Sequence, residues 1–187
     1  MFKQPLIVQT LLDEAKKLHF SMSCDLETGS ILRTLAASKP ESNILEIGTG
    51  VGVSTSWILE GMDTNSNLIS IEMDKEAHQI AKQHLGKDER VTFVTMDGSD
   101  FIKNNKDKKF ELIFADSWPG KFYDLEETLG MLKKGGIYLI DDLTPAENWP
   151  EEHGPKVDHL KEYLSKRDDL QITPLDWSTG LIIAVKK

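Results

Sequence analysis

Cysteine is almost absent from this sequence, and long apolar runs are absent altogether. Cys24 is the one cysteine among 187 residues, which excludes an internal disulfide and favours a reducing compartment. No apolar run approaches the roughly 18 residues that a membrane span requires. The first residues also lack the apolar core and cleavage site of a secretion signal. We therefore expect a cytoplasmic protein with no membrane partner.

Basic side chains are in the minority. Lys and Arg number 22 against 31 Asp and Glu, which gives a formal net charge of −9. This balance argues against non-specific binding to nucleic acid or to an anionic membrane surface. Because 39% of the residues are hydrophobic and 28% are charged, the composition is that of a folded globular protein. The length suits one domain, 1–187.

Short apolar runs alternate with segments of helical spacing. The runs lie at 43–48, 68–73, 91–96, 110–116 and 136–142. Each is about six residues long and mostly apolar, as in parallel strands that are covered on both faces. Helices are predicted at 5–18, 28–38, 53–61, 75–85, 98–104 and 122–133, and Gly135-Gly136 is read as the stop signal of the last one. The pattern predicts an α/β fold with N-terminal helices in 1–38 and a ligand-binding core in 43–142.

The alternation of apolar runs and helical segments ends in the C-terminal part, 143–187. Residues 143–155 are predicted to form a loop, and 155–166 a helix. Two final strands, 170–177 and 180–186, are separated by a tight turn at Ser178-Thr179. So short a connection permits only antiparallel pairing of these two strands.

A glycine-rich loop follows the first predicted strand. Residues 46–52 read EIGTGVG, directly before a predicted helix. Glycines let backbone amides approach a ligand closely, and the helix offers its positive end. Glu72, at the end of the second strand, is placed to accept hydrogen bonds from two ribose hydroxyls. For a dinucleotide the third glycine comes one residue early, and Glu46 suits a cationic ligand better than a pyrophosphate.

These features resemble class I S-adenosylmethionine-dependent methyltransferases from about residue 22 to 186. Segments 27–32, 45–50, 114–116 and 135–142 resemble more narrowly the small O-methyltransferases that include catechol and caffeoyl-CoA methyltransferases and their bacterial relatives. The resemblance implies a Rossmann-like sandwich with sheet order 3-2-1-4-5-7-6 and an antiparallel strand 7. It also implies the following cofactor-binding residues: Met22, Glu46, Gly48, Thr49, Gly50, Gly52, Ser54, Glu72, Met73, Asp97, Gly98, Ser99, Asp116 and Trp118.

Carboxylates end two neighbouring strands of that sheet. Asp116 ends the fourth strand, and Asp141 and Asp142 end the fifth, so all three are expected at one edge beside the glycine loop. Such a cluster requires a neutralising cation, and oxygen ligands favour Mg²⁺ or Ca²⁺. The resembled family holds a metal with two aspartates and an asparagine, and Asp142 stands at the asparagine position. The alternative is that these aspartates only cap the turns that follow.

The lysine expected as general base does not occur at the position that the resembled family gives it. The family has a lysine three residues after the first metal-binding aspartate, whereas this chain has Pro119 there and Lys121 two residues later. Lys121 either turns into the site or is a solvated surface lysine, and the sequence leaves both open. The candidate catalytic residues are Asp116 and Lys121, and segments 117–123 and 143–155 are expected to frame the methyl acceptor.

The resemblance implies methyl transfer to a hydroxyl oxygen of a small molecule, assisted by a divalent metal if one binds. It also implies a homodimer. Three alternatives stay open at this point. One is methylation of tRNA or another acceptor, the second is an NAD-dependent oxidoreductase, and the third is a protein that binds S-adenosylmethionine without catalysis.

Overall fold

The computed structural model describes residues 3–144 and 150–187, so part of the loop expected at 143–155 lies outside the described residues. Within this part the helices are α1 (Val8–Lys17), α2 (Leu26–Ala37), α3 (Val53–Gly61), α4 (Lys75–Leu85), α5 (Gly98–Asn104), α6 (Leu125–Met131) and α7 (His153–Ser165). The strands are β1 (Asn43–Ile47), β2 (Asn67–Glu72), β3 (Val91–Thr95), β4 (Phe110–Ala115), β5 (Leu132–Ile140), β6 (Leu170–Leu175) and β7 (Leu181–Lys186). None of these helices combines the length and apolar character needed to cross a membrane.

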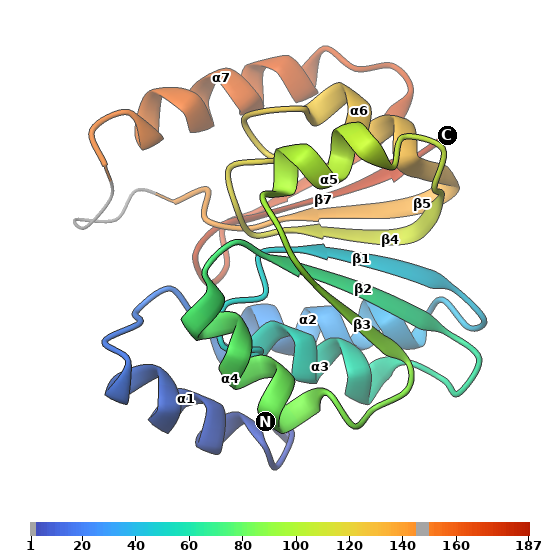
Figure 1. Cartoon of the computed structure of the whole chain (residues 1–187). Helices are drawn as coiled ribbons and strands as arrows, with labels where there is room; N and C mark the ends of the chain where they lie inside the picture. The colour runs from blue at the N-terminus through green and yellow to red at the C-terminus, as the bar shows by residue number, and fades with distance from the viewer. Residues whose placement is uncertain (1–2, 145–149) are drawn as a thin grey trace.

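The strands form one mixed sheet in the order β3-β2-β1-β4-β5-β7-β6 (Figure 1). Strands β1 to β5 pair in parallel, and β7 runs antiparallel to both β5 and β6. The predicted fold class and strand order are therefore confirmed. The order of the strands reverses between β1 and β4, and in such sheets ligands bind beyond the carboxyl ends of the strands at this point.

Helices cover both faces of the sheet, because the central strands are apolar on both sides (Figure 1). In β4, Ile113 and Ala115 pack toward α5, α6 and α7, whereas Leu112 and Phe114 pack toward α1, α2, α3 and α4. This alternation follows from the opposite directions of successive side chains in a strand. The two apolar clusters pack against opposite faces of the sheet. They thereby hold the strands whose carboxyl ends carry the loops of the site.

Aspartates fix the starts of three helices. The side chains of Asp25, Asp74 and Asp97 accept hydrogen bonds from backbone N–H groups in the first turns of α2, α4 and α5. Each such cap stabilises a helix by about 1 kcal/mol. Because α4 and α5 begin immediately after β2 and β3, the caps hold Glu72 and Gly98 at the carboxyl edge of the sheet.

The end of α6 and the start of β5 differ from the prediction. The expected helix at 122–133 is shortened to α6, and β5 begins already at Leu132, which pairs with Phe110. The β4–β5 register then shifts, and Gly135 within this stretch has φ +74°. The glycine pair therefore belongs to an irregular strand instead of stopping a helix. The other elements agree with the prediction apart from their ends.

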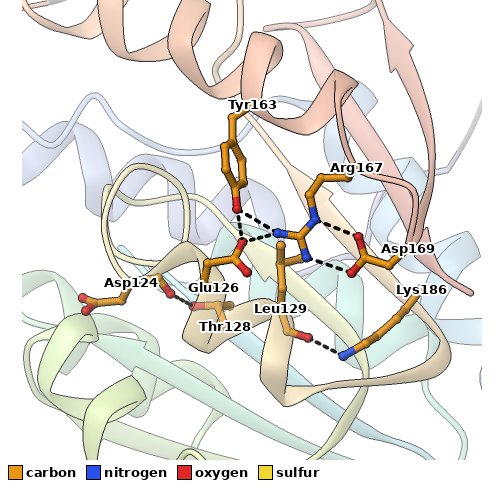
Figure 2. A network of polar contacts seen from close by, with 8 residues as sticks. All are labelled: Asp124, Glu126, Thr128, Leu129, Tyr163, Arg167, Asp169 and Lys186. Carbon is orange, nitrogen blue, oxygen red and sulfur yellow. Dashed lines mark hydrogen bonds and ion pairs between the residues drawn. The ribbon is translucent and has the colours of Figure 1, made fainter.

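A polar network joins α6, α7 and the outer strands (Figure 2). Arg167, after α7, donates to the two carboxylate oxygens of Asp169 at 2.7 and 2.8 Å and to the hydroxyl of Tyr163 at 2.8 Å. It also pairs with Glu126 of α6, which accepts a 2.6 Å hydrogen bond from Tyr163. Lys186 of β7 donates to two carbonyl oxygens of the α6–β5 segment at 2.8 and 3.1 Å. These contacts hold α6 and α7 in place beside the sheet.

Candidate active site

A cavity of about 840 Å³ opens at the carboxyl ends of the parallel strands. The turns after β1, β2, β4 and β5 line it, together with the segment between α1 and α2. Ten of the expected cofactor residues line it, namely Met22, Gly48, Thr49, Gly50, Ser54, Glu72, Met73, Gly98, Asp116 and Trp118. Lys121, Asp141 and Asp142 line the same cavity. The structure therefore brings the expected cofactor loop and the expected acidic cluster into one space.

The glycine loop lies tightly against the ends of β2 and β4. The N–H groups of Gly48 and Thr49 both donate to the carbonyl oxygen of Ile71 at 3.0 Å. Gly48 has φ +107°, and a Cβ atom there would lie 2.7 Å from the carbonyl oxygen of Asp116. Only glycine fits a position that combines this backbone angle with so close an approach. The loop and Asp116 are therefore direct neighbours.

Glu72 presents its carboxylate at the rim of the loop. Its oxygens accept hydrogen bonds from the N–H groups of Gly50 at 2.8 Å and Asp74 at 2.9 Å. A carboxylate oxygen has a further lone pair, so Glu72 can also accept from hydroxyls of a ligand. Met73 follows, with 67% of its surface exposed, and it offers a polarizable apolar contact beside Glu72.

Glu46 lies beneath the loop and outside the lining of the cavity. It is fully buried, and its Oε2 atom accepts hydrogen bonds from Thr55 at 2.6 Å and Ser70 at 2.5 Å. The Oε1 atom is buried without a hydrogen-bond partner in the described structure. Burial raises the pKa of the Glu46 carboxyl, which nearby hydroxyl groups oppose. Glu46 thus links β1, β2 and α3, in contrast to the direct cofactor contact that the resemblance implies.

Gly52, Asp97 and Ser99 also lie outside the lining. Gly52 has φ +97°, and a Cβ atom there would lie 3.1 Å from the Cβ of Ala81 on α4. Asp97 accepts a 2.8 Å hydrogen bond from the N–H of Ser99 as the cap of α5. These residues shape the loops around the cavity, and only Gly98 of that turn reaches it.

Asp116, Asp141 and Asp142 lie at the carboxyl edge of the sheet, where all three line the cavity. Asp141 is 2% exposed, and its Oδ1 atom accepts hydrogen bonds from the Asp142 N–H at 2.7 Å and from the Thr179 hydroxyl. Burial raises the pKa of Asp141 to about 6. Burial and the charges of Asp141 and Asp142 raise the pKa of Asp116 well above its usual value. Asp116 can therefore hold a proton more readily than an ordinary aspartate.

Lys121 turns into this cluster, which decides between the two positions that the sequence left open. Its side chain is 2% exposed, and its Nζ atom donates to the carbonyl oxygen of Asp141 at 2.9 Å. The same Nζ atom lies 4.0 Å from Oδ2 of Asp142. The displaced lysine is therefore a buried cation among carboxylates.

Aromatic rings form the wall above Lys121. The ring of Trp118 packs edge-to-face with those of Phe122, at 5.8 Å, and His153, at 6.1 Å. The Nζ atom of Lys156 lies 5.3 Å from the centre of the Trp118 ring. Burial lowers the pKa of His153, so its ring is biased toward the neutral form. Such a wall suits a flat or aromatic ligand.

Two parts of the lining were not predicted. Residues 20–24 all line the cavity, although only Met22 was expected there. Thr179, from the β6–β7 turn, lines it as well. The carbonyl oxygen of Thr179 accepts from the N–H groups of Leu143 and Thr144, which fixes the turn beside Asp141. No local signal marks Thr179, because only the pairing of β7 with β5 brings it to the site. Burial and the surrounding carboxylates raise the thiol pKa of Cys24, which disfavours a reactive thiolate.

The donor set does not fit the Mg²⁺ or Ca²⁺ that the resemblance implies. Within residues 3–144 and 150–187, no group of three or more His, Cys, Asp or Glu side chains is arranged to hold a metal ion. An ion at the predicted ligands would face the Lys121 ammonium, and Oδ1 of Asp141 already accepts two hydrogen bonds. The metal prediction is therefore not supported by this arrangement.

Comparison with known sequences identifies the family. Residues 45–143, more than half of the chain, match the family described as a methyltransferase domain. Catechol O-methyltransferase B of Danio rerio is 28% identical over 134 residues, which cover 66% of this chain and 51% of that protein. The chain spans about half the length of the curated relatives it matches.

Solved structures share the fold. An O-methyltransferase from Bacillus cereus, solved in complex with S-adenosylhomocysteine, has a TM-score of 0.87 at 19% identity and covers 100% of this chain and 93% of its own. The O-methyltransferase TomG of Streptomyces achromogenes, solved with S-adenosylmethionine, has a TM-score of 0.86 at 18% identity and covers 100% and 92%. The resemblance stated from the sequence is thereby confirmed. The chain belongs to the methyltransferase-domain family.

Proposed function

We propose that this protein transfers a methyl group from S-adenosylmethionine to a hydroxyl oxygen of a small molecule. The observation that carries the proposal is the single cavity that joins the glycine loop and Glu72 to Asp116 and its neighbouring carboxylates. The family match supports methyl transfer. The O-methyltransferase names of the relatives support oxygen as the receiving atom.

The residues of the cavity fit this cofactor. Glu72 offers carboxylate oxygens for ribose hydroxyls, and the exposed side chain of Met73 offers an apolar surface for the adenine ring. The carboxylates at the end of β4 and β5 supply negative charge for a cationic ligand. When bound, S-adenosylmethionine supplies an electrophilic methyl group on a sulfonium.

Asp116 is the proposed proton acceptor. A hydroxyl group must lose its proton as the new bond to carbon forms, and the raised pKa of Asp116 makes its carboxylate a stronger base than an exposed aspartate. Trp118 and His153 line the same cavity as Asp116 and are proposed to orient the acceptor. The Nζ atom of Lys121 donates a hydrogen bond to the carbonyl oxygen of Asp141. We therefore propose that Lys121 acts through its positive charge and not as the proton acceptor.

A small molecule is the proposed acceptor because the acidic lining repels the phosphates of a nucleic acid. A divalent ion takes no part in this proposal, since the donor set described above does not fit one. The cytoplasm and a homodimer stay predictions from the sequence and the resemblance.

Calorimetric titration with S-adenosylhomocysteine tests the cofactor. We expect Glu72→Gln, which keeps an acceptor for the Gly50 N–H but removes the charge, to weaken binding about tenfold. Glu111→Gln is the matched control, because Glu111 also accepts a backbone N–H, that of Asn43 at 2.8 Å, but lies outside the cavity lining. This control should bind like the wild-type protein.

Turnover is then measured as S-adenosylhomocysteine released with a panel of catechol-like and other hydroxylated acceptors. Methylated product confirms the proposal. Binding of NADH without binding of S-adenosylhomocysteine would replace it with an oxidoreductase. Tight binding of S-adenosylhomocysteine with no product from any acceptor would leave a non-catalytic binding protein.

A further inference from the structure

We propose that Lys121 is a built-in cation that takes the place of a divalent metal ion among Asp116, Asp141 and Asp142. The protein would then work without Mg²⁺ or Ca²⁺. The meaning of this inference for catalysis rests on the proposed function, but its main test measures ion binding and is independent of methyl transfer.

The burial of Lys121 is the first argument. An ammonium group is costly to bury unless charges and hydrogen bonds compensate for the lost water. Here the compensation comes from the Asp141 carbonyl oxygen at 2.9 Å and from the carboxylate of Asp142, whose Oδ2 atom lies at 4.0 Å. The charge of Lys121 also opposes the rise in the pKa of Asp116. The same charge opposes the rise in the pKa of Asp141, so one cation acts on all three carboxylates.

The turn before Lys121 is the second argument, because it fixes where the side chain enters. The N–H of Gly120 donates to the carbonyl oxygen of Tyr123 at 2.7 Å, and the hydroxyl of Tyr138 on β5 donates to the carbonyl oxygen of Gly120. Gly120 has φ +81°, and a Cβ atom there would lie 2.8 Å from Cδ1 of Ile47. The turn is thus anchored to β5 and packed against β1. It directs Lys121 inward although the residue comes two positions later than the family lysine.

Competition for the carboxylates is the third argument. Mg²⁺ and Ca²⁺ bind oxygen atoms at about 2.0 to 2.6 Å and need several of them. An ion at that distance from Asp142 would lie near the Lys121 ammonium and be repelled by it. Lys121 offsets part of the negative charge of the cluster and occupies the space beside Asp142, so an added divalent ion gains little from it.

The test compares the wild-type protein with Lys121→Met, which keeps the length of the side chain and removes its charge. Each protein is stripped with a chelator and titrated with Mg²⁺ and then Ca²⁺, by calorimetry and by thermal unfolding. We expect no binding and no change in melting temperature for the wild type. In Lys121→Met we expect binding to appear, together with a rise in melting temperature on adding either ion.

Lys161→Met is the matched control, because Lys161 donates to the carbonyl oxygen of Leu143 at 2.8 Å and forms no ion pair with the three aspartates among the described contacts. It should behave like the wild type. Adding Asp142→Ala to Lys121→Met should weaken the acquired ion binding by about tenfold or more.

Micromolar binding of Mg²⁺ or Ca²⁺ to the wild type would overturn the inference, and so would a folded Lys121→Met protein that gains no ion binding. If Lys121→Met does not fold, the wild-type titration and the effect of a chelator on wild-type turnover decide alone. If the protein binds S-adenosylhomocysteine but methylates no acceptor, the proposed function fails while the ion titrations still test Lys121.

Discussion

His78 of α4 is a titratable group that the structure buries completely. Its Nδ1 atom lies 2.8 Å from the hydroxyl of Thr95, and its ring packs edge-to-face on Phe93. The side chain is 0% exposed. Burial, with a smaller effect of the Lys82 charge, lowers the pKa of His78 to about 4.

This burial predicts a loss of stability on acidification. The pKa of a histidine in the unfolded chain is about 6.5, so the unfolded state binds the proton first as the pH falls from about 6.5 to 4. The free energy of unfolding should therefore decrease over this range and be fully retained above it. In His78→Asn the decrease should be smaller, as measured by urea unfolding at several pH values. Above pH 7 the two curves should run parallel, and an equal acid-induced decrease in the variant would contradict the assignment.

Among single residues, those of the glycine loop could be predicted from the sequence, whereas the position of the Lys121 side chain could not. Gly48 and Glu72 were identifiable because a strand, a glycine turn and an acidic strand end occur at fixed spacing. The inward direction of the Lys121 side chain was not identifiable, because it depends on the hydrogen bond from the Tyr138 hydroxyl to Gly120. This bond exists only when the sheet has formed. The buried position of Glu46 could not be predicted either, since hydroxyls on β2 and α3 hold its carboxylate, and its contact with the cofactor stays a prediction.

The contact between α6 and α7 depends on Arg167, which follows α7 (Figure 2). Its guanidinium is shared among Glu126, Tyr163 and Asp169, and its side chain is 19% exposed. Single surface ion pairs contribute little, but a network with bidentate geometry contributes more.

We expect Arg167→Gln to lower the free energy of unfolding by about 1 to 2 kcal/mol. Its binding of S-adenosylhomocysteine should be unchanged, because Arg167 does not line the cavity. Lys166→Gln serves as the control, since Lys166, directly after α7, forms its one described ion pair with the exposed Glu162 of that helix. Thermal unfolding distinguishes the two, and equal melting temperatures would show that the network adds no stability.

The strands of the central sheet were predictable because both of their faces are apolar, whereas the boundary between α6 and β5 was not. Leu132 is apolar and suits either a helix or a strand, so its own chemistry does not decide. Its pairing with Phe110, and the register shift that follows, exist only when β4 is in place. The long-range pairing therefore overrides the local glycine signal at 135.

The negative charge of the chain and of its cavity determines which partners can approach the protein. The formal net charge is −9, and the cavity is lined by Glu72, Asp116, Asp141 and Asp142. A polyanion gains affinity chiefly when basic side chains neutralise its phosphates and release its counterions, and Lys121 is the one lysine or arginine among the described lining residues.

We expect no binding of tRNA at physiological salt, as measured by fluorescence anisotropy, and only weak binding at low salt. A salt titration provides the control, because a true nucleic-acid site shows a steep linear decrease of log affinity with log salt. Micromolar binding with such a slope would shift the proposed acceptor from a small molecule to tRNA.

The place of β7 between β5 and β6 has a consequence for the order in which the molecule can be completed during translation. Residues 179–186 leave the ribosome after the other six strands of this sheet, but they join β6 to the sheet and bring Thr179 to Asp141. The N-terminal part can begin to fold earlier, as nascent domains generally do. The part of the cavity around Asp141 and Thr179 is therefore completed last. Until β7 has joined the sheet, a partly synthesised chain has an incomplete cavity and is not stabilised by a bound ligand.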